Sequence, residues 1–257
     1  MMTVTTPEAQ VAEITNVFRD VFAPIAAWNT ALVALLSGQT APKRASVDRL
    51  VADLVRPELA RVGGLVVGAG FVAAPGYLSD APWHLAWWLG EGNSFGTGGR
   101  RGQVRRLEAV EDPSAESFRD HTALEWWRVP ARTGLRHITG PYVDYLCTDD
   151  YTLTLTEPVF VDGTMVGVVG ADLYVTDAER VLLASLARIG TDASLVNSAG
   201  RVVVSTDPRR ATGSLLRDEA LTAALADLPA GSAVDLGDGR RLSSCAGTPL
   251  AVLTTAA

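Results

Sequence analysis

The sequence is poor in the residues that build metal centres, disulfide frameworks and covalent active sites. It contains two cysteines, Cys147 and Cys245, and three histidines, His84, His121 and His137. The cysteines have no metal-type spacing and the histidines are scattered, so we expect no metal site and no cofactor. Both cysteines are expected to act as small, partly buried hydrophobic residues. No serine or cysteine lies in a nucleophile motif, which argues against covalent catalysis.

Signals for export and membrane insertion are also missing. The opening stretch MMTVTTPEAQ contains no lysine or arginine, whereas a secretory leader begins with a basic region. The longest apolar stretch, Val21–Leu36, is interrupted by Pro24, Asn29 and Thr30. It falls short of the roughly 18 uninterrupted apolar residues of a membrane span. The sequence therefore predicts a soluble, cytoplasmic protein that does not contact a membrane.

Excess positive charge is absent as well. The formal net charge is -7, which argues against non-specific binding to nucleic acid or to an anionic lipid surface. The 257 residues are 47% hydrophobic and 20% charged, as in ordinary globular proteins. This length allows one large domain or two small ones with sizeable cores.

The first predicted element is a long helix. Thr6, Pro7 and Glu8 form a helix start, with a cap, a proline in the first helical position and an acidic first turn. Apolar residues then recur at alternating spacings of three and four, at Val11, Ile14, Phe18, Val21, Ile25, Trp28, Leu32 and Leu35. Such a heptad seam fits a helix packed on its own domain or a helix that pairs with a second copy. A homodimer through this helix is the predicted assembly.

The remaining signals predict an α+β fold, because helices and antiparallel strands follow one another without a βαβ rhythm. Three domains are expected: the long helix and a linker at 1–44, a larger module at 45–189 and a smaller one at 190–257. Each module is predicted to be a mainly antiparallel sheet flanked by helices. Local predictions include a helix over 46–61, strands over 63–74, 83–90 and 103–110, a helix over 112–128 that Pro130 breaks, a hairpin over 193–205, and a helix over 215–228 followed by three strands.

A β-hairpin stands out in the larger module. Thr152–Phe160 alternates β-branched residues, Asp162 and Gly163 form the turn, and Met165–Val175 returns. Two glycines lie in the returning strand, which often marks the close approach of a ligand or of another backbone.

Those glycines are Gly167 and Gly170, and Asp172 follows them as a charge in an apolar run. A buried carboxylate needs a cationic or hydrogen-bonding partner. That partner is either an arginine of the protein or a ligand.

Aromatic and acidic residues gather around this hairpin. The candidate ligand-binding residues are Trp126, Trp127, Tyr142, Asp144 and Asp172. Aromatic faces attract cations, and a neighbouring carboxylate orients ammonium hydrogens. Adjacent residues on a helix point about 100° apart, so only one of the two tryptophans can face a pocket fully. Two alternatives stay open: the tryptophans seal the helix against the sheet, and Asp144 faces solvent.

The segments LEWWRVPARTG, GPYVDY and YTLTLTEPVFVDGTMVGVVGADLYV, followed by a compact second module, resemble the double Cache sensor family. These are tandem PAS-like ligand-binding domains of bacterial chemoreceptors and sensor kinases. The resemblance covers essentially the whole chain and implies a non-catalytic sensor. Members lie between two membrane helices and drive a signalling module. Because neither is found here, a stand-alone sensor is expected, which reports by dimerisation or through a partner protein.

The resemblance also implies ligand chemistry. In amino-acid-sensing members a tryptophan–tyrosine pair, a tyrosine and two aspartates contact the ligand, at positions that match Trp126, Trp127, Tyr142, Asp144 and Asp172. The family's carboxylate-binding arginine falls on Leu124. An amine, polyamine or quaternary ammonium ligand is therefore implied. An amino acid remains an alternative if another arginine, Arg119, Arg128 or Arg132, holds its carboxylate.

Two further readings compete with a sensor. His121 and Glu125 stand one helical turn apart and could form an acid–base pair of an enzyme, although such pairs are commonly exposed surface contacts. A scaffold or partner subunit with a vestigial pocket is the other alternative.

Overall fold

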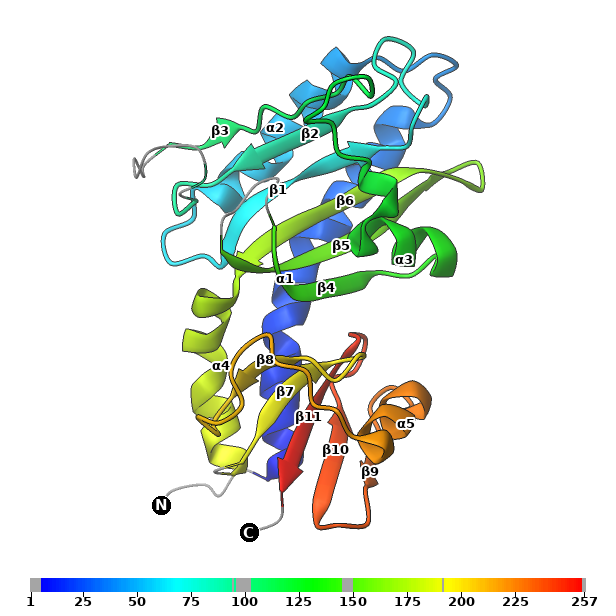
Figure 1. The fold of residues 1–257 in the computed structure, drawn as a ribbon. Coiled ribbons are helices and arrows are strands. Elements are labelled where there is room, and N and C mark those ends of the chain that lie inside the picture. The colour runs from blue at the N-terminus through cyan, green and yellow to red at the C-terminus, as the bar shows by residue number, and fades with distance from the viewer. Residues whose placement is uncertain (1–5, 94, 96–102, 145–149, 191, 256–257) are drawn as a thin grey trace. The chain divides into compact units, whose positions relative to one another are not determined.

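The computed structural model describes residues 6–93, 95, 103–144, 150–190 and 192–255. Their contacts divide the chain into two compact units. The six-stranded unit comprises 21–139 and 143–174, and the five-stranded unit comprises 1–20, 140–142 and 175–257. Both sheets are accompanied by helices (Figure 1), which confirms the predicted α+β class. The exit helix at 175–189, which we predicted to belong to the larger module, makes its contacts in the five-stranded unit.

The six-stranded sheet has the order β3-β2-β1-β6-β5-β4. Its strands are β1 (Val66–Ala73), β2 (Leu85–Leu89), β3 (Arg105–Arg106), β4 (His137–Val143), β5 (Tyr151–Val161) and β6 (Thr164–Tyr174). The longest pairing is the β5–β6 hairpin, in antiparallel register from Thr152↔Tyr174 to Val161↔Thr164. Its turn residues Asp162 and Gly163 have φ angles of 50° and 76°, as a tight two-residue hairpin requires.

The helices that accompany this sheet are α2 (Arg44–Leu59), the short 3-10 turn η1 (His121–Ala123) and α3 (Glu125–Thr133), together with the C-terminal part of α1 (Pro7–Leu36). Helices α1 and α2 lie behind the sheet in Figure 1, and α3 lies in front of it. The buried stripe of α2 is Val47, Val51, Val55 and Leu59. Successive strand residues face opposite sides of a sheet. One face of β1 and β2 is thus packed against α2, and the other is left for the site.

The apolar seam of α1 is buried within the chain itself. Ile14, Phe18, Val21, Ile25, Trp28 and Leu32 are each at most 7% exposed, while Val11 and Leu35 are half-buried. This seam is therefore occupied by intramolecular packing. A homodimer, which stays a prediction, has to use another face of the helix.

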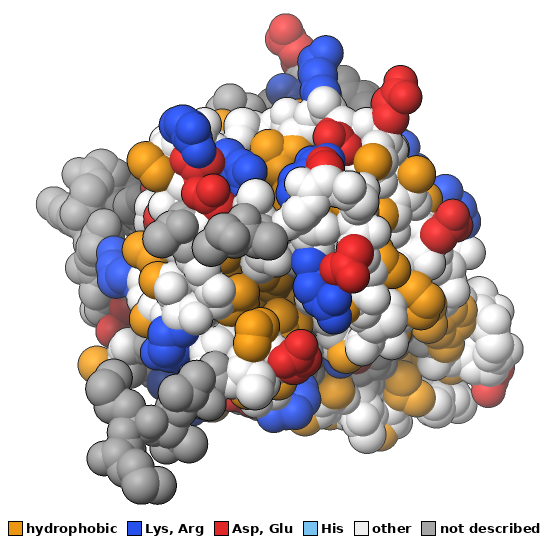
Figure 2. Space-filling model, turned by 90° about the horizontal axis from the view of Figure 1, so that it is seen from below, with side chains coloured by type: hydrophobic (Ala, Val, Ile, Leu, Met, Phe, Trp, Pro, Cys, Tyr) orange, Lys and Arg blue, Asp and Glu red, His pale blue; other side chains and the backbone are white. Residues whose placement is uncertain are grey.

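The five-stranded sheet has the order β8-β7-β11-β10-β9. Its strands are β7 (Ser194–Asn197), β8 (Val202–Ser205), β9 (Ala233–Asp235), β10 (Arg240–Ser244) and β11 (Leu250–Thr255), with helices α4 (Val175–Ile189) and α5 (Glu219–Asp227). Its core consists of aliphatic side chains, Val196, Val202, Leu221, Leu242, Ala251 and Leu253. Charged side chains of both signs are interspersed with hydrophobic ones on the face shown in Figure 2, and neither sign dominates it.

Three local predictions were wrong. The strand expected over 103–110 pairs only at Arg105 and Arg106. The helix expected over 112–128 is replaced by turns up to η1, because the Asp112 carboxylate accepts hydrogen bonds from the backbone N–H (2.9 Å) and hydroxyl (2.7 Å) of Ser114. That closes a local turn instead of capping a helix. Pro130 does not end a helix either, since it lies inside α3.

Candidate functional site

A row of residues across the centre of the six-stranded sheet forms the base of the site. Gly68 of β1 pairs with Asp172 of β6, and Asp172 pairs with Thr154 of β5. Asp172 is 1% exposed, and its Oδ1 accepts a hydrogen bond of 2.7 Å from the Thr154 hydroxyl. The buried carboxylate predicted from the sequence thus lies in the middle of the sheet, oriented by a neighbouring strand.

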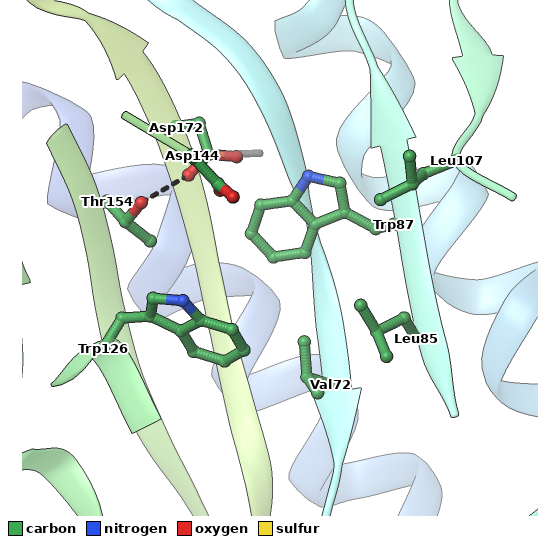
Figure 3. A pocket seen from close by; sticks show the side chains of 8 residues that line it. All are labelled: Val72, Leu85, Trp87, Leu107, Trp126, Asp144, Thr154 and Asp172. Carbon is green, nitrogen blue, oxygen red and sulfur yellow. Dashed lines mark hydrogen bonds between the residues drawn. The ribbon is translucent and has the colours of Figure 1, made fainter. Parts of the chain in front are cut away.

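A cavity opens over this row (Figure 3). Its lining side chains are Val72, Leu85, Trp87, Leu107, Trp126, Asp144, Thr154 and Asp172. All of them belong to the six-stranded unit. The volume open to the centre of a water molecule is about 20 Å³, enough for one or two waters. A ligand of amino-acid size therefore requires these side chains to move apart.

Three of the five predicted residues meet in this cavity. Trp126, Asp144 and Asp172 line it, and the two carboxylates point toward the same space in Figure 3. Asp144 is 7% exposed, so the alternative of a solvent-facing carboxylate was wrong. Trp127 and Tyr142 are not among the lining side chains. Tyr142 is half-buried on β4, and its contacts place it with the five-stranded unit.

Helix α3 presents Trp126 because of a proline. Pro130 has no N–H, so the carbonyl of Trp126, four residues earlier, has no helical donor. The hydroxyl of Thr156 on β5 donates to that carbonyl at 2.9 Å. Because of the proline, the Trp126 carbonyl is available to Thr156, and this hydrogen bond ties α3 to β5. Trp127 points elsewhere, as expected for adjacent helical residues.

Trp127 belongs instead to an aromatic cluster around His121. The His121 ring lies 5.0 Å from Trp83, 5.1 Å from Trp127 and 6.1 Å from Trp126, measured between centroids. His121 is 1% exposed, and burial lowers its pKa to about 4. This histidine is therefore neutral at pH 7. The two adjacent tryptophans thus differ in their surroundings: Trp126 lines the cavity, and Trp127 packs against His121 without reaching the cavity.

The acid–base pair considered for an enzyme does not form. Glu125 Oε1 lies 2.9 Å from Nε2 of His137, while His121 is enclosed by tryptophan rings. Since the suggested pair is split between two environments, the sequence feature that favoured catalysis loses its geometric basis.

The glycines around the cavity serve close backbone approach. A Cβ on Gly170 would lie 2.4 Å from the Leu155 carbonyl oxygen, and one on Gly167 would lie 2.3 Å from that of Val72 and 2.5 Å from the Phe71 ring. The close approach predicted for Gly167 and Gly170 is thus to other backbone segments and an aromatic ring. Gly68, which sequence reasoning did not single out, leaves the space between Trp87 and Asp172.

A charged network supports the outer wall of the cavity. His84, 1% exposed, lies between Asp48 of α2 (Nε2···Oδ1 2.8 Å) and Glu111 (Nδ1···Oε1 2.7 Å). Arg106 of β3 donates to both Asp48 oxygens, at 2.8 and 3.0 Å. Burial alone would raise the pKa of Asp48. The hydrogen bond from His84 and the charge of Arg106 outweigh burial and hold this pKa below its usual value. The network fixes the segments that carry the cavity residues Leu85 and Leu107.

The position of the family's arginine, Leu124, is half-buried and precedes α3. Arg119 lines a neighbouring cavity of about 140 Å³ that shares Leu85 and Leu107 with the first. Its guanidinium donates to the carbonyls of Glu116 and Phe118. Arg128 and Arg132 are exposed on α3. None of these three arginines lines the cavity that contains Asp172.

No group of histidine, cysteine and acidic side chains able to hold a metal occurs within the described ranges. Cys245 is fully buried beside Thr15, and burial raises the pKa of its thiol to about 12. It acts as the expected small hydrophobic residue. Cys147 lies outside the described residues.

Comparison with known proteins agrees with this geometry. Residues 105–179 match the family model for the first PDC sensor domain of methyl-accepting chemotaxis protein-like proteins. No curated protein matches the sequence. The matched segment includes β3, α3 and the β5–β6 hairpin, so it covers most of the elements that form the cavity.

Solved structures of sensor domains share the fold at low identity. The ligand-binding domain of the Pseudomonas fluorescens chemoreceptor CtaA in complex with L-valine is 18% identical, with a TM-score of 0.56 over 97% of this chain and 93% of that chain. The ligand-binding domain of the Pseudomonas aeruginosa PAO1 amino acid chemoreceptor PctB with L-Arg is 16% identical (TM-score 0.54, 96% and 89%). The extracellular domain of the putative histidine kinase mmHK1S-Z3 is 14% identical (TM-score 0.59, 95% and 88%).

The chain therefore has the fold of a tandem PAS-like sensor. The resemblance to double Cache sensor domains, read from the sequence, is confirmed. Residues 105–179 thus resemble a chemoreceptor sensor domain, and the solved structures show that the whole chain shares the fold of such domains. None of its described helices combines the length and hydropathy needed to cross a bilayer.

Proposed function

We propose that the six-stranded unit senses a small molecule that carries a protonated amino group. The observation that carries this proposal is the convergence of Asp144, Asp172 and the Trp126 ring on one cavity. Buried carboxylates favour a cationic partner, and an indole face adds to its attraction. The Thr154 hydroxyl orients one of the carboxylates.

The ligand is an amine, a polyamine, a quaternary ammonium compound or an amino acid. Structures with the same fold contain L-valine, L-isoleucine, L-Arg and GABA, all of which carry an amino group. The apolar part of the lining, formed by Val72, Leu85 and Leu107, suits a short aliphatic chain. These two observations support amino acids as much as simple amines.

A sensor must also pass its signal on. We expect the output to involve a regulatory protein partner or a second copy of the chain. Because the heptad seam of α1 is buried, the dimer would form through another face. The cytoplasmic location also stays a prediction.

A thermal-shift screen tests the proposal against the scaffold alternative. Amines, polyamines, betaines and amino acids are added singly to the purified protein. A ligand at 100 times its dissociation constant contributes about 2.7 kcal/mol of stability and raises the melting temperature by several degrees. If no compound of these four classes moves the melting temperature, the sensor function is contradicted and a scaffold with a vestigial pocket is favoured.

A further inference from the structure

The indole of Trp87 has a buried donor that the protein does not use. The side chain is 6% exposed and lies in the cavity wall. Its Nε1 has no hydrogen-bond partner among the described residues. A buried tryptophan N–H normally has an acceptor, and leaving it unpaired costs free energy. An unpaired donor in a cavity wall indicates an acceptor that arrives with the ligand.

The place of this donor is defined by Gly68. A Cβ built on Gly68 would lie 3.0 Å from Trp87 Nε1 and 3.1 Å from Asp172 Oδ2. The donor and the carboxylate therefore flank the same small space, which remains open because residue 68 has no side chain. Figure 3 shows the Trp87 indole beside the two aspartates, with its nitrogen on the upper edge of the ring.

The polar groups of the cavity are thus of two kinds. Asp144 and Asp172 offer acceptors for an ammonium group, and Trp87 offers one neutral donor. A molecule that satisfies both carries an amino group and an oxygen acceptor close to each other, because Trp87 Nε1 and Asp172 flank the same space. A simple alkylamine or polyamine satisfies the carboxylates and leaves the indole donor unpaired.

Building on the proposed function, we infer that Trp87 is a specificity-determining residue whose Nε1–H donates to a carbonyl or carboxylate oxygen of the ligand. It supplies a donor for the ligand's oxygen in a cavity that Arg119, Arg128 and Arg132 do not line. The ligand class this selects is an α-amino acid or its amide, in preference to the corresponding amine.

Isothermal titration calorimetry with three probes tests this inference. L-valine and L-valinamide carry the oxygen acceptor, with and without negative charge, and isobutylamine lacks it. The wild-type protein is expected to bind valine or valinamide at least tenfold more tightly than isobutylamine, about 1.4 kcal/mol. In Trp87→Phe, which keeps an aromatic ring, the preference is expected to fall to about twofold.

Trp88→Phe is the matched control. Trp88 is the next residue on β2 and is also buried, but it faces the other side of the sheet, with the Arg106 guanidinium 5.6 Å from its ring centre. This variant removes an indole of the same size from the same strand. Its preference for valine or valinamide over isobutylamine is expected to match that of the wild type.

An NMR measurement on the unaltered protein gives a second readout if Trp87→Phe does not fold. Valinamide is expected to shift the Trp87 indole N–H resonance, and isobutylamine is expected to leave it near its unliganded position.

The inference is overturned if isobutylamine binds the wild type as tightly as both valine and valinamide, if Trp87→Phe keeps the full preference, or if the indole resonance responds equally to valinamide and isobutylamine. Asp172→Asn separates this failure from that of the proposed function. If Asp172→Asn binds none of the three probes while Trp87→Phe keeps the wild-type preference, Trp87 does not determine specificity. The proposed amine-binding site at Asp172 is then retained. Failure of all three probes to bind the wild type overturns both.

Discussion

The two sheets of this protein fill the space above their central strands in different ways. In the five-stranded unit the space is filled by aliphatic side chains, with Leu221 of α5 and Leu242 of β10 both fully buried. In the six-stranded unit the central strands carry a hydroxyl, a carboxylate and a glycine, at Thr154, Asp172 and Gly68.

This difference bears on the proposal that the six-stranded unit binds the ligand. A sheet face covered with close-packed aliphatic groups gains stability from burial and leaves no space. A face with buried polar groups needs partners for them, and at Trp87 the described chain provides none. The contrast therefore supports the proposed ligand site in the six-stranded unit, and the aliphatic core of the five-stranded unit stabilises its fold.

The largest expected effect lies in the five-stranded core. Leu242→Ala removes a fully buried side chain from the aliphatic cluster and should lower the free energy of unfolding by about 2–5 kcal/mol. Urea unfolding followed by circular dichroism measures this loss. Under conditions where the variant is folded, its affinity for a screened ligand should equal that of the wild type. A tenfold weaker affinity would show that the five-stranded core takes part in binding.

The second effect concerns the aromatic cluster of the six-stranded unit. His121 has a pKa of about 4 in the folded protein and 6.5 when unfolded. The unfolded chain therefore binds the proton first, and stability is lost as the pH falls from about 6.5 to about 4. The difference amounts to roughly 3 kcal/mol. His121→Phe, which keeps an aromatic ring, should flatten the pH dependence of urea unfolding in this window. An equally steep profile would mean that His121 is not buried in the neutral form.

A smaller effect is expected where Thr154 orients Asp172. Thr154→Val keeps the shape of the side chain and removes the 2.7 Å hydrogen bond to the carboxylate. Ligand affinity should fall about threefold to tenfold, near 1 kcal/mol, because the carboxylate loses the hydroxyl that orients it. Ser194→Ala is the control in the other sheet, since it removes a buried hydroxyl that contacts Ser205 at 2.9 Å. Equal losses of affinity in Thr154→Val and Ser194→Ala would contradict the proposal that only the six-stranded sheet takes part in ligand binding.

The parts of the fold with strong local signals could be predicted from the sequence. The β5–β6 hairpin follows from its alternating pattern and the Asp162–Gly163 turn, and both residues adopt the positive φ angles this turn requires. Asp172 could be identified because a charge in an apolar strand is conspicuous. The seam of α1 was also evident, but the spacing alone did not distinguish packing within the chain from packing against a second copy.

Features that depend on pairing between distant strands could not be predicted. Trp87 is one of three tryptophans in the segment 83–88, and only its pairing with Gly70 of β1 places it on the cavity side. The same holds for Thr154, whose role depends on its register with Asp172. The two glycines at 68 and 70, spaced to share one face of a strand, were the available signal for a hollow at this position.

The central claim is that Asp172 binds the amino group of a ligand in the six-stranded unit. Its most direct test is calorimetric titration of the wild type and of Asp172→Asn with one ligand identified in the thermal-shift screen. Asparagine keeps the acceptor oxygen for Thr154, so the variant should fold, and its far-ultraviolet circular dichroism and melting temperature check this. We predict at least a tenfold loss of affinity, because the carboxylate charge is removed from a buried site. An unchanged dissociation constant in the folded variant would contradict the account.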